Sequence, residues 1–85
     1  MIPLTAVGKK ISAELDSIEK QTLNNYSLSG ISQCYVKCFI IGEAEDYYFV
    51  LLKSVVQLPG YDFVQNEKFR LMKSDLSVIW AYHWL

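Results

Sequence analysis

The first part of the chain repeats apolar residues at the spacing of an α-helix. They recur at intervals of three and four residues, at Leu4, Val7, Ile11, Leu15 and Ile18. Most positions between them are charged or polar, so a helix here would carry one apolar stripe on a polar cylinder. We predict an amphipathic helix over about residues 5–23, with Thr5 as its N-cap and Asn24 and Asn25 at its end.

After Gly30 the period changes from that of a helix to that of a β-strand. The strand pattern covers about residues 32–41 and again about residues 47–56, and each run presents two faces of alternating residues that are largely apolar or aromatic. The polar turn between these runs is short, so we predict an antiparallel hairpin. Pro59-Gly60 marks a second turn, because Pro favours the first central position of a turn and Gly tolerates positive φ at the next.

The segment after this second turn is less regular. We expect residues 61–66 to be irregular or briefly extended, and residues 68–73 to form a third strand that ends at Ser74-Asp75. Leu76–Leu85 is the most apolar segment and contains both tryptophans and the single histidine. Its β-branched and aromatic residues favour a fourth strand, but their spacing also fits a helical stripe, so both alternatives remain open. Such a terminus is expected to be docked, not frayed.

These elements predict an α+β fold in which an N-terminal amphipathic helix packs on a four-stranded antiparallel sheet, in the order α-β-β-β-β and in two layers. Both faces of the predicted strands are apolar or aromatic. Because one helix covers only one face, the other face needs a cover. The candidates are a homodimer mate, another partner, residues 58–66 folded back as a loop, or strong curvature of the sheet.

Composition limits the class of protein. The 85 residues have room for one domain, residues 1–85, and 52% apolar content excludes a disordered chain. Lys and Arg are spread along the sequence and the formal net charge is -1, so we expect no direct binding of nucleic acid. We find neither a signal-peptide pattern nor an apolar run of the ~20 residues that span a bilayer. We therefore expect a cytoplasmic protein without membrane contact.

The sequence offers no catalytic, cofactor or metal site. Cys34 and Cys38 on one strand would lie roughly 13 Å apart, too far for a disulfide, and we interpret them as small buried side chains. His83 has no second histidine or C-x-x-C pair to complete a metal site. A catalytic Cys-His pair would need the first and last strands to be adjacent. We therefore expect no enzymatic activity.

The aromatic residues and an acidic turn are the candidates for binding. Tyrosine and tryptophan contribute strongly to protein interfaces, and the acidic turn could dock on a basic surface. The candidate partner-binding residues are Tyr35, Glu43, Glu45, Asp46, Tyr47, Phe49, Trp80 and Trp84. We predict a small non-enzymatic protein-binding module that occludes a partner's surface, as small phage, plasmid or immunity-type inhibitors do. The alternatives are a small RNase-toxin-like domain and a structural homodimer subunit.

Overall fold

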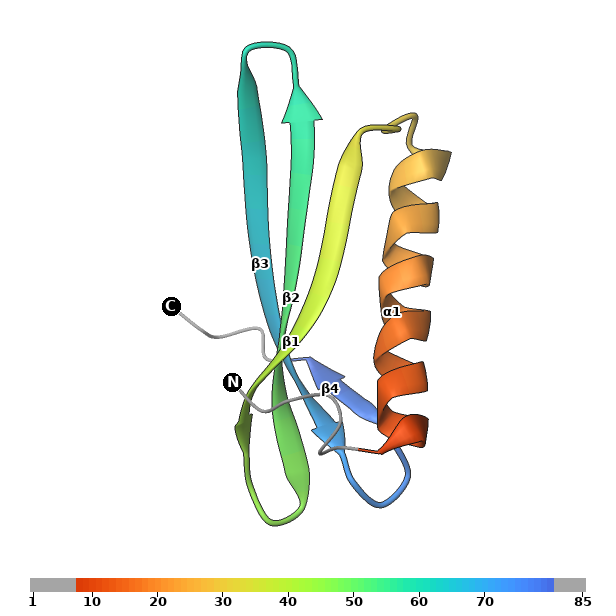
Figure 1. The fold of residues 1–85 in the computed structure, drawn as a ribbon, viewed down its shortest axis with the longest axis vertical. Coiled ribbons are helices and arrows are strands. Elements are labelled where there is room, and N and C mark those ends of the chain that lie inside the picture. Colours follow the sequence, from red (N-terminus) through yellow and green to blue (C-terminus); the bar gives the residue numbers. More distant parts are fainter. Residues whose placement is uncertain (1–7, 81–85) are drawn as a thin grey trace.

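The computed structural model describes residues 8–80 and shows one helix and four strands (Figure 1). In chain order they are α1 (Lys9–Leu28), β1 (Cys34–Glu43), β2 (Tyr47–Leu58), β3 (Tyr61–Met72) and β4 (Val78–Trp80). The strands form one antiparallel sheet in the order β1-β2-β3-β4. The predicted α+β class, the α-β-β-β-β order and the packing of the helix on the sheet are confirmed. Over this part of the chain, α1 is not apolar enough to cross a membrane.

The helix lies further along the chain than predicted. It begins at Lys9 with Gly8 in the N-cap position, whereas Thr5, the predicted cap, lies outside the described residues. At the other end it continues past Asn24 and Asn25 to Leu28. The last turn is held because Tyr26 packs against the core and its carbonyl accepts the Ile31 N–H at 2.9 Å. This tertiary contact outweighs the tendency of asparagine to end a helix.

The strand β3 corrects the prediction for residues 61–66. That segment is fully extended, because β2 runs to Leu58 and each residue of Tyr61–Met72 pairs with a β2 residue across the Pro59-Gly60 turn. It lengthens the sheet and so does not fold back as a cover. The β2–β3 hairpin projects beyond β1 and α1 (Figure 1). The β3 residues 61–67 are all exposed, and β4 pairs only with residues 69–71.

The core lies between α1 and one face of the sheet. The buried strand residues belong to this face, and the most deeply buried are Ile40, Val50, Phe69 and Leu71. Leu15 is the buried residue of α1, while Ile11, Ile18 and Tyr26 pack against the cluster. The alternation that predicted two-sided strands is therefore correct, with the even-numbered positions of β2 facing the helix.

The chain segment before β4 forms a tight turn, as Ser74-Asp75 predicted. The Ser77 N–H donates to an Asp75 carboxylate oxygen at 3.0 Å, and the Leu76 N–H donates to the Met72 carbonyl at 3.0 Å. The hydrogen bond from Ser77 lowers the pKa of Asp75. Extended structure is confirmed for Val78–Trp80, and the remainder of the predicted fourth strand lies outside the described residues.

Candidate functional site

The sheet carries a second set of side chains on the face opposite the buried one, which we call the open face. The helix α1 packs mainly against β1 and covers the other side of the sheet. None of the open-face residues between 34 and 80 is fully buried. Its apolar members on β1 and β2 are Tyr35, Phe39, Tyr47, Phe49, Leu51 and Val55. On β3 and β4, Val64 and Ile79 continue the apolar surface, each 50% exposed.

Three of the predicted binding residues lie on this face. Tyr35 is 56% exposed, and Tyr47 and Phe49 are half-buried neighbours whose rings meet edge to face with centroids 5.0 Å apart. The Arg70 guanidinium lies 4.9 Å from the Tyr47 ring centroid and 5.7 Å from that of Phe49. Its charge is attracted to the electron-rich ring faces, so this end of the open face is an ordered aromatic and cationic cluster.

The predicted acidic residues lie elsewhere, at the β1–β2 turn. Glu43 pairs with Lys73 of the segment after β3, and the Asp46 carbonyl accepts the Lys73 N–H at 2.9 Å. The hydrogen bond to Glu43 raises the pKa of Lys73. Glu45 and Asp46 are exposed. The acidic turn is thus tied to the neighbouring chain segment and is separate from the open face.

The structure also separates Trp80 from the open face. Its ring packs on the helix side of the sheet, 4.9 Å from the Phe69 ring centroid, and is partly buried against the core. Trp84, also predicted to bind a partner, and His83 lie outside the described residues. Of the eight predicted residues, the described structure therefore places Tyr35, Tyr47 and Phe49 on one face, with Tyr35 opposite Val55 and the other two in contact further along β2.

Four cations on the open face were missed as a group. They come from three separate strands. The register makes Lys37 and Lys53 direct cross-strand partners, and on β3 Lys68 and Arg70 lie diagonally from Lys53, opposite Leu51 and Phe49. We call this set of four side chains the basic diagonal. The sequence did carry a signal for the face of two of them, because residues two apart in a strand lie on the same side of a sheet. Lys37 therefore shares a face with Tyr35 and Phe39, and Lys53 shares a face with Leu51 and Val55. Recognising the diagonal also required the cross-strand register.

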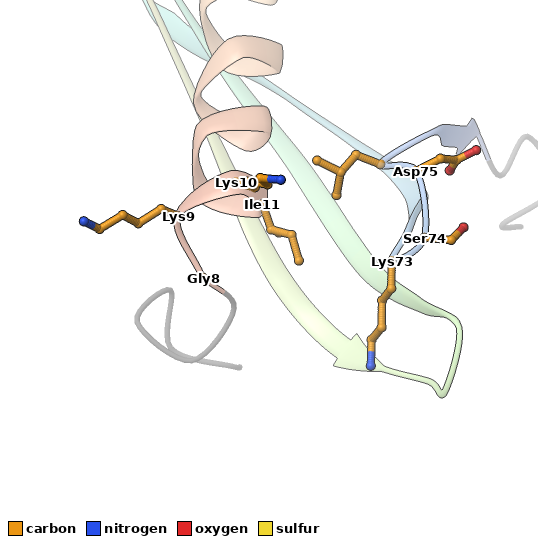
Figure 2. Close-up of a pocket in the computed structure, with 8 residues that line it drawn as sticks. Gly8, Lys9, Lys10, Ile11, Lys73, Ser74 and Asp75 are labelled. Carbon is orange, nitrogen blue, oxygen red and sulfur yellow. The ribbon is translucent and has the colours of Figure 1, made fainter.

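A hollow of about 520 Å³ lies between the start of α1 and the turn before β4 (Figure 2). Lys9 points away from the turn, and Ser74 and Asp75 point away from the helix (Figure 2). Small-molecule sites need a few polar groups that converge on a ligand within an enclosed pocket. These polar side chains do not converge, so the hollow does not form such a site.

The cysteines are not arranged for nucleophilic chemistry. Both are free, and Cys38 is buried in the core. Burial, with a smaller contribution from the nearby Glu19 carboxylate, raises the pKa of the Cys38 thiol to about 12. The thiol is therefore protonated near neutral pH, and thiolate is the nucleophilic form. No group of three His, Cys, Asp or Glu side chains that could hold a metal ion gathers within residues 8–80.

Comparison of the chain with protein-family models, with curated proteins and with solved structures finds no match.

Proposed function

We propose that this protein is a non-enzymatic protein-binding module that covers part of a partner protein with the open face of its sheet. By occluding that surface it would act as a small inhibitor or immunity-type protein. The observation that carries the proposal is the exposure of large apolar side chains on the face opposite α1, among them Tyr35, Val64 and Ile79. Exposed apolar surface on one face of a small domain is typical of interaction sites.

The composition of the open face supports a protein partner. Aromatic residues and arginine are enriched at the centres of protein interfaces, where they supply most of the binding energy. Tyr47, Phe49 and Arg70 already contact one another, so they would lose little side-chain entropy on binding. The free thiols of Cys34 and Cys38 are compatible with a reducing compartment such as the cytoplasm.

The test identifies the partner and then maps the surface it contacts. Affinity capture from the native host with mass spectrometry names candidates, and binding is then measured with the purified partner. We expect the double substitution Tyr35→Ala and Val64→Ala to raise Kd by about tenfold or more. Leu28→Ala is the matched control, because Leu28 is 79% exposed on α1 and lies off the open face.

Two results would contradict the proposal. One is a partner that binds the double variant as tightly as it binds the wild type, provided that circular dichroism shows the variant to be folded. The other is degradation of RNA by the purified protein that scales with its concentration and is lost in a His83→Ala variant, which would favour the RNase-like alternative.

A further inference from the structure

We infer that the partner presents carboxylates among apolar side chains where it meets the open face, and that the basic diagonal binds those carboxylates. This inference rests on the proposed function and specifies the chemistry of the partner. The juxtaposition that carries it is the alignment of Lys37, Lys53, Lys68 and Arg70 across three strands.

The centre of the diagonal is a pair of like charges. Lys37 and Lys53 are directly opposite each other in the β1–β2 ladder, an arrangement that is destabilising in a sheet. The other cross-strand neighbour of Lys53 is Asn66, which is uncharged. Lys37 has a partner at the strand edge, since its Nζ lies 3.9 Å from a Glu19 carboxylate oxygen. An anion placed over Lys53 would relieve the repulsion, so part of the binding energy would come from charge already present in the free protein.

The balance of charge on this face is cationic, although the chain as a whole has a net charge of -1. Among the β1–β3 residues on the open face, Asp62 is the carboxylate, and it lies beside the Pro59-Gly60 turn opposite Gln57. Lys53, at the centre of the diagonal, therefore has no carboxylate among its cross-strand partners, which are Lys37 and Asn66. This local charge is complementary to a carboxylate-bearing surface.

The apolar rows on each side of the diagonal favour a protein over a nucleic acid. On one side Val55 pairs with Tyr35 and Val64, and on the other Leu51 pairs with Phe39 and Lys68. Single-stranded nucleic acid binds through successive aromatic stacking platforms, and here each aromatic ring is followed across the sheet by aliphatic side chains, which bury apolar protein surface. A second copy of this chain placed face to face would oppose one basic diagonal to another, which Coulomb repulsion disfavours.

The test uses the full-length, 15N-labelled protein and three probes of equal length. The first is a synthetic peptide with the repeat Glu-Leu-Glu-Glu-Leu, the second has Gln in place of each Glu, and the third is oligodeoxythymidylate. We expect the Glu peptide to shift amide resonances of residues 35–37, 51–55 and 66–70, and to bind more weakly as salt is raised. The Gln peptide should bind at least about fivefold more weakly.

Charge reversal provides the matched variants. Lys53→Glu should weaken binding of the Glu peptide by about fivefold or more, whereas Lys20→Glu, on the exposed side of α1, changes the net charge equally and should leave binding unchanged. Equal binding of the Glu and Gln peptides at the open face would overturn the inference while leaving the proposed docking function standing.

Three further outcomes would also overturn it. They are tighter binding of oligodeoxythymidylate than of the Glu peptide, self-association of the protein through the open face in sedimentation, and a gain in peptide binding when residues 81–85 are deleted. These results would assign the face to nucleic acid, to a second copy or to the chain's own terminus. Loss of natural-partner binding in the double variant at Tyr35 and Val64, without any effect of Lys53→Glu, would reject the charge inference alone.

Discussion

Cys38 shows how burial changes the chemistry of a single residue. It is 4% exposed and sits among Leu52 and the other core residues, so ionising its thiol would place a charge in an apolar environment. The Glu19 carboxylate disfavours the thiolate further. For Cys38, the interpretation from sequence as a small buried side chain is therefore confirmed.

Because the pKa of Cys38 is raised, the free energy of unfolding depends on pH in the alkaline range. Between pH 9.0 and about 12 the thiol loses its proton in the unfolded chain but keeps it in the folded one. The folded state then binds more protons, so the free energy of unfolding falls with rising pH, at a limiting slope of about 1.4 kcal/mol per pH unit. Urea titrations at several pH values measure this slope.

Substituting Cys38 separates the contribution of its thiol to this slope from that of other side chains that titrate at alkaline pH. Cys38→Ala should be less stable than the wild type at pH 8 but should show a shallower decline above pH 9.0. An unchanged slope in Cys38→Ala would show that the thiol is not the group responsible.

At the level of elements, Glu19 joins the helix to the sheet. Cys38 directs its N–H away from β2, towards the outer edge of β1, and donates it to a Glu19 carboxylate oxygen at 3.4 Å. Without this acceptor the N–H would lie unpaired at a partly buried strand edge. One helix side chain thus satisfies the backbone of β1 and also pairs with Lys37.

We expect Glu19→Ala to lower the free energy of unfolding by about 1 kcal/mol, because the hydrogen bond is long and the Lys37 pair is partly exposed. The amide of Cys38 should exchange with solvent about fivefold faster or more. Glu19→Gln retains a carbonyl acceptor and should restore most of the protection. Native-state hydrogen exchange by NMR measures the exchange rate of the Cys38 amide. Equal rates in the wild type and both variants would contradict this role of Glu19.

The elements that the sequence predicted best are those whose signals are local. Alternation identified β1 and β2, and Pro59-Gly60 located the turn between β2 and β3, where Gly60 has φ 89°. Residues 61–66 were missed because their extension depends on pairing with β2 and not on their own pattern. The helix end was misplaced for a similar reason, because Tyr26 holds the last turn through the core.

The candidate surface was predictable in part. The aromatic members Tyr35, Tyr47 and Phe49 follow from alternation alone. The basic diagonal does not, because Lys37 and Lys53 become neighbours only through the register of two strands, and a bulge at Ile40–Gly42 shifts that register further along. Trp80 was assigned to the interface from its residue type, whereas its position is set by pairing with Phe69.

At the scale of the whole molecule, one layer of side chains holds the helix and sheet together. Phe69 is fully buried, pairs with Val50 and Trp80 and lies near the centre of the core. Replacing it with alanine should lower the free energy of unfolding by about 3–5 kcal/mol. This is a large share of the stability of a small domain.

Phe63 is the matched control, since it lies on the same strand but is 52% exposed. Phe63→Ala should cost less than about 1 kcal/mol. Urea unfolding followed by circular dichroism measures both variants. Similar losses for Phe63→Ala and Phe69→Ala would contradict the position of the core described above.

The projecting β2–β3 hairpin gives the molecule a gradient of stiffness. Around Phe69 the sheet is backed by the core, so the aromatic and cationic cluster at Tyr47 rests on a firm support. Towards Pro59-Gly60 the strands are joined to each other but exposed on both sides, and such regions open most readily. If the proposed partner docks on this sheet, it would contact a firmly supported region around Phe69 and a more easily deformed hairpin end, which could adjust its shape to the partner's surface.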